Sequence, residues 1–175
     1  MSRVAGITYA AFAILSISLS AAQQRRDPLT PAEINQLRDA AQDPDQRLKL
    51  FVQFARARLT SLEQMRADPK VTDRDQDTHD NLQDFLDVYD ELDDNVDTFV
   101  DRGADLRKIL KFVIEADSEF AVRLRALKNN AQIQKENTSA YEFLLTSALD
   151  TLKSSTEDHR ELLAQQEQAF KRKKK

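Results

Sequence analysis

The sequence predicts an all-helical protein: an antiparallel up-down four-helix bundle preceded by a short N-terminal helix. Two observations predict this fold. The 175 residues include only 2 Gly and 4 Pro, whereas sheet proteins use both residues in their many turns. Apolar residues also recur every three or four positions along most of the chain, which is the spacing of one helix face. The length is that of a single domain.

Residues 1–22 have the pattern of a cleaved signal peptide. A short basic start, residues 1–3, precedes the uncharged run 4–19, and the small residues 20–22 then precede a cut before Gln23. This order is typical of secretory signal peptides. The mature chain would therefore be exported, either periplasmic or secreted. The alternative is a retained N-terminal membrane anchor, although the apolar run is shorter than the roughly 20 residues that span a bilayer.

Residues 23–43 are expected to form an N-terminal arm with one short helix. In Thr30-Pro31-Ala32-Glu33, Thr30 is the predicted N-cap and Glu33 completes a reciprocal capping box. Pro31 falls at the first helical position, where its missing N–H costs nothing. Asp43-Pro44 begins the next helix in the same way.

The bundle is expected over residues 44–171, followed by a basic tail at residues 172–175. The periodicity and the breaks between helices predict four helices near residues 44–67, 73–101, 105–135 and 139–171. Thr72 is the expected cap of the second of these helices, and Ser139 with Glu142 forms the expected capping box of the fourth. Short connections make consecutive helices antiparallel.

An alternation of three and four can be followed from Leu82 to Leu127, and it is interrupted by polar Asp117 and by Gly103, the only Gly of the mature chain. This repeat is typical of a bundle or coiled-coil seam. Gly103 has two interpretations. As a helix terminator it favours a turn, with Asp105 capping the next helix. As a mid-helix residue, at a cost of about 1 kcal/mol relative to Ala, it implies one long helix that forms an extended coiled-coil dimer. We adopt the turn.

The charge distribution is uneven. The formal net charge is −4, which argues against generic nucleic-acid binding because that needs a basic face. Residues 73–105 contain thirteen acids and only two bases. This acidic helix either faces solvent and the basic helices on both sides of it or docks a cationic protein partner. The candidate partner-binding residues repeat along the side opposite the seam: Asp80, Asp84, Asp87, Glu91 and Asp94.

A calcium-loop pattern begins at the same helix. Asp73, Asp75, Asp77 and Asp84 fall at positions that could ligate calcium, but Thr78 stands where an EF-hand loop needs Gly. First-turn carboxylates favoured by the helix dipole account for the same acids. Weak divalent-cation binding through these four residues is therefore only an alternative.

Several chemistries are excluded by composition. The chain has no Cys and only two His, so thiolate metal sites and cysteine nucleophiles are excluded. His79 and His159 are expected about 20 Å apart along the bundle axis at 1.5 Å per residue, and cannot share a metal. His159 is expected to be a hydrogen-bonded core residue and Asp117 to pair with an Arg or Lys. We expect no catalytic residues, no cofactor and no enzymatic activity.

One local pattern resembles a known family. Leu29-Thr30-Pro31-Ala32-Glu33, followed by Leu37-Arg38, resembles the Leu-Thr-x-x-Gln signature of periplasmic helical stress proteins and chaperones. Val71-Thr72-Asp73-Arg74-Asp75 is a fainter second copy. Glu33 and Asp75 stand where that family has Gln. The resemblance implies an exported, Cys-free, helical chaperone or metal-stress sensor.

Taken together, these patterns predict an exported helical bundle that acts by protein–protein interaction. The partner is expected to be a protein, with a cationic surface if it docks on the acidic helix. Nucleic acid is not expected as a partner, nor is a stable membrane span after signal cleavage. The alternatives are a chaperone or envelope-stress sensor, a weak cation binder, and a homodimer.

Overall fold

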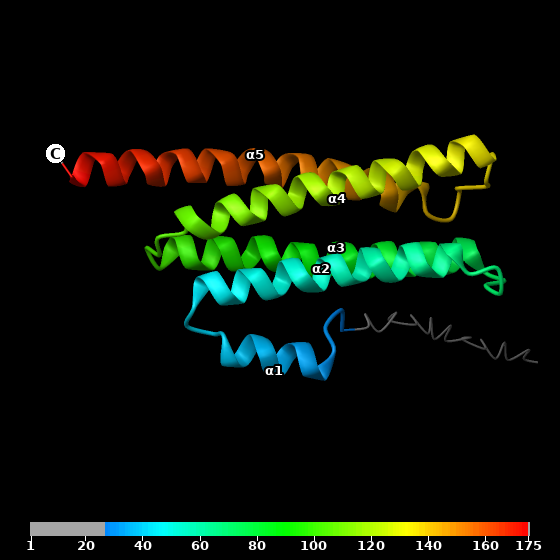
Figure 1. Cartoon of the computed structure of the whole chain (residues 1–175), viewed down its shortest axis with the longest axis horizontal. Coiled ribbons are helices and arrows are strands. Elements are labelled where there is room, and N and C mark those ends of the chain that lie inside the picture. Colours follow the sequence, from blue (N-terminus) through cyan, green and yellow to red (C-terminus); the bar gives the residue numbers. More distant parts are fainter. Residues whose placement is uncertain (1–26, 175) are drawn as a thin grey trace, which may run out of the picture.

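The computed structural model describes residues 27–174; the predicted signal peptide and Lys175 lie outside this range. The described residues form five helices and no strand: α1 (Pro31–Asp39), α2 (Pro44–Ala67), α3 (Arg74–Asp101), α4 (Arg107–Gln134) and α5 (Glu142–Lys173). Figure 1 shows the four long helices running side by side, with α1 folded back along α2. The predicted fold class, a four-helix bundle preceded by a short helix, is confirmed.

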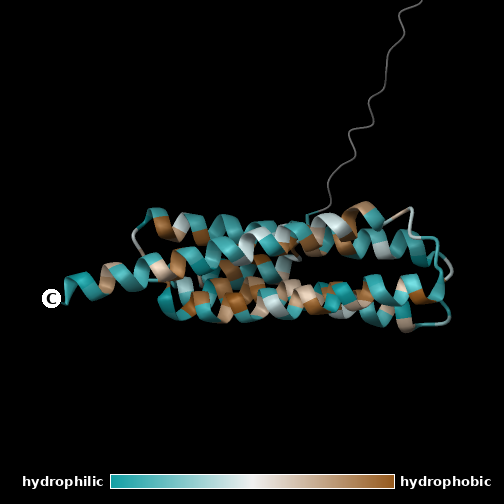
Figure 2. Ribbon diagram, turned by 90° about the horizontal axis from the view of Figure 1, so that it is seen from above, coloured by the Kyte–Doolittle hydropathy of each residue, from teal (hydrophilic) through white to brown (hydrophobic). Residues whose placement is uncertain are grey.

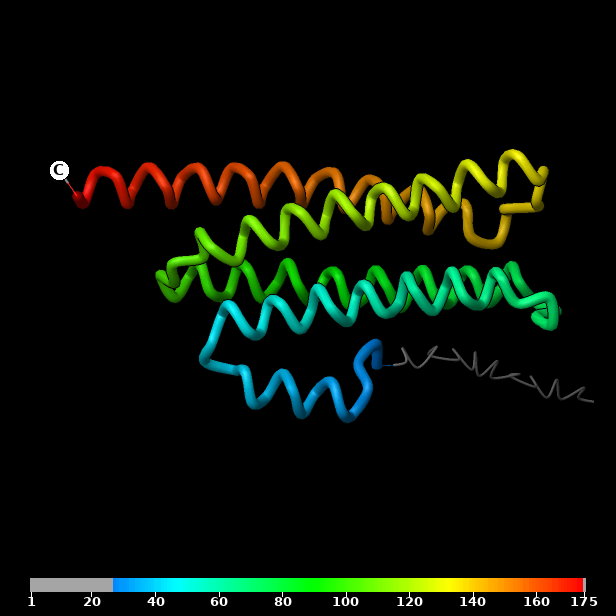
Figure 3. The backbone as a smooth tube through the Cα atoms, viewed as in Figure 1, coloured from blue at the N-terminus to red at the C-terminus, as the bar shows by residue number. Residues whose placement is uncertain are grey.

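The long helices are arranged as two stacked hairpins, α2 with α3 and α4 with α5. Helix α2 packs against α3 and α4, whereas α5 packs against α4 and α3. The consecutive helices α3 and α4 are therefore diagonal in the bundle. The sequence interpretation placed the acidic helix, α3, beside both basic helices. It lies instead beside α2 and α5. Figure 3 shows the α3–α4 loop, which leads the backbone from the first hairpin to the second.

The first two helix starts are as predicted. The Thr30 hydroxyl accepts a hydrogen bond from the Glu33 N–H at 3.2 Å, and the Glu33 carboxylate accepts one from the Thr30 N–H at 2.7 Å. Asp43 caps α2 by accepting from the Gln46 N–H at 3.0 Å. These caps satisfy backbone donors that have no partner within a helix.

The expected caps of α3 and α5 are wrong. The N-cap of α3 is Asp73, not Thr72, and no side chain caps that end. The Ser139–Glu142 capping box does not form, because α5 begins at Glu142, three residues later than expected. The backbone carbonyl of Thr138 instead accepts hydrogen bonds from the N–H groups of Tyr141 and Glu142, at 3.0 and 2.7 Å. This turn buries the Tyr141 ring against the core.

Gly103 ends α3. Its φ of 72° is left-handed, a conformation that glycine adopts without steric cost. The Ala104 N–H bonds the Phe99 carbonyl at 3.0 Å and the Gly103 N–H bonds the Val100 carbonyl at 2.8 Å, which is the Schellman arrangement. The turn is therefore confirmed, and the single long helix is not formed. The expected Asp105 cap does not form, because the N-cap of α4 is Leu106 and no side chain caps that end. Asp105 lies one residue before it and accepts from the Arg107 N–H at 3.2 Å.

The core is built from the predicted seam. Apolar and polar residues alternate along every helix in Figure 2, and the apolar ones meet between the helices. Phe85 and Phe120 cross the diagonal between α3 and α4 edge to face, with ring centroids 5.6 Å apart. Such pairs add about 0.5–1.5 kcal/mol beyond area burial. Within residues 27–174, no helix is long and apolar enough to cross a membrane.

Candidate functional site

A polar network lies inside the apolar core and joins α3, α4 and α5. Asp117 of α4 is fully buried. One of its carboxylate oxygens accepts the Tyr89 hydroxyl at 2.7 Å, and the other lies 3.0 Å from His159 Nδ1. His159 Nε2 lies 3.3 Å from a carboxylate oxygen of Asp93, whose other oxygen accepts the Ser155 hydroxyl. Every member therefore has a polar partner from a different helix.

The network favours a charged imidazole. Burial is the largest single influence on the His159 pKa and lowers it, but the hydrogen bonds and charges of Asp117 and Asp93 together raise it to about 9. The pKa of Tyr89 is raised, first by burial and then by the charge of Asp117, so its hydroxyl keeps its proton and donates. At neutral pH His159 is thus an imidazolium held between two carboxylates.

The network corrects one sequence expectation. Asp117 was expected to pair with an Arg or Lys, and its partners are His159 and Tyr89. His159 is the expected hydrogen-bonded core histidine, with 4 % of its surface exposed. Because its ring nitrogens and both Asp117 oxygens are engaged inside the protein, the cluster cross-links three helices. Buried polar groups of this kind can set helix register.

A second feature is the outward side of α3, which we call the acidic face: Asp80, Asp84, Asp87, Glu91 and Asp94. The structure leaves Asp80, Glu91 and Asp94 exposed and Asp84 and Asp87 half-buried. His79 Nδ1 lies 3.2 Å from the Asp80 carboxylate. Two further contacts within the helix join residues four apart, from Gln76 to Asp80 at 2.8 Å and from Gln83 to Asp87 at 2.7 Å. Such i, i+4 contacts leave the carboxylate charge in place.

The basic residues of α2 and α4 pair elsewhere. Their closest partners are carboxylates of α1, α2, α4 and the loop after α4, in the pairs Arg58–Glu33 at 2.7 Å, Arg66–Glu136 at 2.6 Å, Arg56–Glu119 at 2.8 Å and Arg123–Glu63 at 2.8 Å. Among residues 27–174, no Lys or Arg lies within ion-pair distance of Asp80, Asp87, Glu91 or Asp94. The expected charge pairing between α3 and both neighbours therefore fails at these positions, because α4 lies diagonal to α3.

The candidate calcium residues lie along a helix rather than around a loop. Asp73 is the N-cap of α3, Asp75 and Asp77 follow in its first turn, and Asp84 lies further along. Within the part of the chain that the structure describes, no three His, Asp or Glu side chains are grouped closely enough to hold a metal ion. Cation binding by these residues stays a prediction.

The Leu29–Glu33 segment has a structural role. Arg58 of α2 donates to both Glu33 oxygens, at 2.9 and 2.7 Å, and to the Pro28 carbonyl at 2.6 Å. Burial raises the Glu33 pKa, but hydrogen bonds from Arg58 and Thr30 outweigh it, so the pKa is lowered overall. The capping box thus also fastens α1 to α2.

Two apolar side chains are exposed where α4 turns into α5. Ile133 in the last turn of α4 is 78 % exposed, and Phe143 in the first turn of α5 is 82 % exposed. We call this pair the apolar end. Only the packing shows that both side chains stay in water.

The chain was compared with family models, with curated proteins and with solved structures. No match was found in any of the three comparisons.

Proposed function

We propose that this protein is an exported helical bundle that binds a cationic protein partner through the acidic face of α3. The supporting observation concerns four residues of this face: within residues 27–174, Asp80, Asp87, Glu91 and Asp94 form no ion pair with a Lys or Arg. Four arginines of α2 and α4 pair with other carboxylates instead. Complementary charge across an interface increases association rates and excludes wrong partners. Arg47 lies near Glu91, whose charge opposes the fall in the Arg47 pKa caused by burial, but the two are not an ion pair.

The test combines partner capture with two matched charge reversals. The first variant changes Asp80, Asp84, Asp87 and Asp94 to Lys. The control changes four exposed acids of α5 to Lys: Asp150, Glu157, Asp158 and Glu161. Both variants shift the net charge equally. A stoichiometric partner is first captured by cross-linking to the unmodified chain and then purified. We expect its affinity for the α3 variant to fall at least tenfold and its affinity for the α5 control to stay unchanged.

Equal loss in both variants would reduce the interaction to general electrostatic attraction. Unchanged binding in both would place the interface elsewhere on the molecule. Either outcome contradicts the proposal. Circular dichroism of each variant checks that the helices remain folded.

A second candidate function, a chaperone for unfolded envelope proteins, is favoured by the apolar end. Exposed apolar side chains are the groups that bind unfolded chains, and the resemblance at Leu29–Glu33 points to the same class. This function predicts that the protein suppresses aggregation of a denatured client at near-equimolar amounts. Ile133→Ser combined with Phe143→Ser should abolish the suppression, whereas the α3 charge-reversal variant should retain it. The absence of any suppression would remove this candidate.

The weak cation alternative has its own measurement. Calorimetric titration with calcium would give a saturable heat below millimolar concentration if Asp73, Asp75, Asp77 and Asp84 bind the ion together. A titration without such heat contradicts the alternative.

A further inference from the structure

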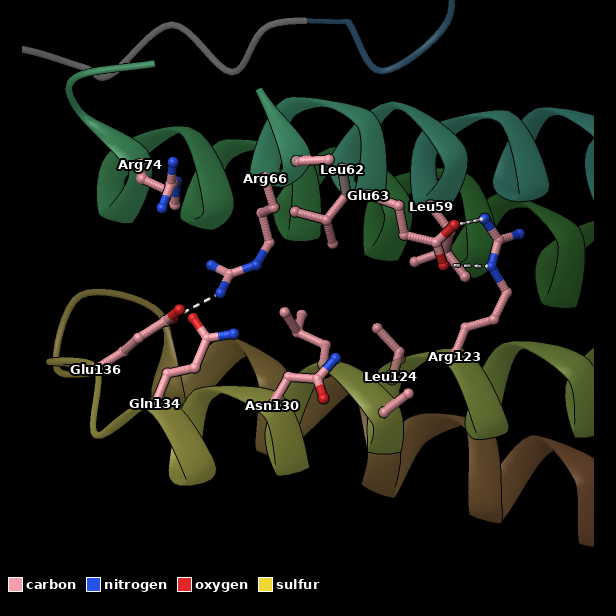
Figure 4. A pocket seen from close by; sticks show the side chains of 13 residues that line it. Leu59, Leu62, Glu63, Arg66, Arg74, Arg123, Leu124, Asn130, Gln134 and Glu136 are labelled. Atoms are coloured by element: carbon pink, nitrogen blue, oxygen red, sulfur yellow. Dashed lines mark hydrogen bonds and ion pairs between the residues drawn. The ribbon is translucent and has the colours of Figure 1, made fainter. Parts of the chain in front are cut away.

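A cavity of about 370 Å³ opens between α2 and α4, near the ends that lead into the α2–α3 and α4–α5 loops. Figure 4 shows it between the two helical hairpins. It is separate from the acidic face and from the His159 network. Its volume is within the range of small-molecule sites, roughly 300–1,000 Å³.

The middle of the cavity is apolar. Leu59 and Leu62 of α2 face Leu124 of α4 across it, and Leu127 of α4 also lines it. Leu62 and Leu124 are almost fully buried from solvent, so the wall they form belongs to the core. Ala67, Ala126 and Leu127 line the same cavity and keep exposed surface, which an apolar ligand segment lying against them would remove from water.

Two of the three arginines that line the cavity are already neutralised. Arg123 donates to both Glu63 oxygens at 2.8 Å. Arg66 donates to Glu136 at 2.6 Å and to the Thr78 hydroxyl at 3.0 Å. All four charged members of these pairs line the cavity, so the two pairs together add no net charge to its wall.

The third arginine, Arg74, is different. Its Nη2 donates to the Asp68 carbonyl at 3.3 Å, and its Nε is buried without a hydrogen-bond partner. No carboxylate of residues 27–174 lies within ion-pair distance of it. The wall of the cavity therefore carries one more positive than negative charge, and Arg74 is the lining arginine that forms no ion pair.

We propose that this cavity binds an amphipathic monoanion, a carboxylate on an aliphatic tail, with the carboxylate at Arg74 and the tail along the apolar wall formed by Ala67, Ala126 and Leu127. Guanidinium and carboxylate match in geometry and form charge-assisted hydrogen bonds. One carboxylate balances the single surplus charge, whereas a dianionic phosphate monoester would leave an excess negative charge beside Glu63 and Glu136. The inference is independent of the protein-binding function proposed above.

The test uses three probes that share a ten-carbon tail: decanoate, decanol and decylammonium, each below its micelle concentration. Calorimetry on the purified chain should show saturable 1:1 binding of decanoate. Decanol should bind at least tenfold more weakly, and decylammonium should not bind. Amide NMR shifts caused by decanoate should be confined to residues around the cavity, including Leu62 and Leu124.

Two variants and one control locate the head group and the tail. Arg74→Gln should weaken decanoate at least tenfold and leave decanol unchanged. Ala126→Phe, at a position that lines the cavity and is exposed in the unliganded protein, should fill the cavity and weaken both probes. The control, Arg125→Gln, removes an equal charge from an exposed position of α4 outside the cavity and should leave both affinities unchanged.

Four results would overturn the proposal. These are no saturable decanoate binding, decanol as tight as decanoate, Arg74→Gln without effect, or Arg125→Gln with the same effect as Arg74→Gln. Thermal unfolding of each variant shows whether the fold is kept. If Arg74→Gln does not fold, the contrast between decanoate and decanol on the unmodified chain still decides the question.

Discussion

His159 Nδ1 lies 3.0 Å from the Asp117 carboxylate at the centre of the bundle, where Asp117 has no exposed surface. This contact joins α5 to α4, and the Tyr89 hydroxyl brings α3 to the same carboxylate at 2.7 Å. Helices α3 and α4 are diagonal and meet through side chains in the core, among them Phe85 and Phe120. The polar network thus links α3 and α4, whose backbones are not neighbours in the bundle.

The first prediction concerns the loss of the imidazole. His159→Ala leaves the buried Asp117 carboxylate without its cationic partner, and we expect the free energy of unfolding to fall by about 3–5 kcal/mol. Urea denaturation measures this change. The matched control is His79→Ala, because His79 is 38 % exposed and touches only the neighbouring Asp80; it should change the stability by less than about 0.5 kcal/mol. Similar losses for both variants would contradict a structural role for the network.

The second prediction concerns pH. The folded-state pKa of His159, about 9, lies above the usual histidine value of 6.5. A raised pKa contributes stability that is complete below the unfolded-state value and is lost as the pH rises through the folded-state value. We therefore expect the His159 contribution to fall by roughly 2–3 kcal/mol between pH 6.5 and pH 9. The measurement is the difference in unfolding free energy between the unmodified chain and His159→Gln across that range. A pH-independent difference would contradict the charged imidazole.

The third prediction concerns the turn between α3 and α4. Gly103→Ala should lower the unfolding free energy by about 1–2 kcal/mol, because a left-handed φ of 72° is unfavourable for an L-residue. A Cβ at this position would meet no atom within 4 Å, so the whole effect is conformational. Lys135, the C-cap of α4, is a non-glycine residue in the same left-handed region, at φ 53°. Lys135→Gly should therefore raise the unfolding free energy. The same sign for both substitutions would contradict this explanation.

The fourth prediction concerns the attachment of α1. Arg58→Met removes the paired hydrogen bonds to Glu33. Both side chains are largely buried, with 16 % of Arg58 and 12 % of Glu33 exposed. Amide exchange in α1 should become faster by at least tenfold, while α3 is unchanged. Lys108→Met is the control, because the Lys108 side chain is 82 % exposed in its pair with Asp45 and exposed pairs contribute little. Unchanged exchange in α1 after Arg58→Met would show that other contacts hold it.

Local chemistry determined the helices. Thr30, Asp43 and Pro44 specify two helix starts through groups within three residues of each other, and Gly103 specifies a helix end through its φ alone. Such signals are read within one turn of chain, so the predicted range 44–67 agrees with α2 as observed. The caps expected at Thr72, Asp105 and Ser139 do not form. The segment before α5 forms a different turn that buries Tyr141, and the core contacts of that ring are not visible in the local pattern.

The sequence by itself determined the fold class, the helices and the seam, because these depend on spacings of one to four residues. Tertiary structure decided which helices are neighbours and which side chains meet. Asp117 is 28 residues from Tyr89 and 42 from His159, and Arg74 shares a cavity with residues of α2 and α4. Periodicity gives each helix an apolar face but does not say which faces meet. That choice follows from packing the side chains of all the helices together, which is why the network and the cavity emerge only from the folded chain.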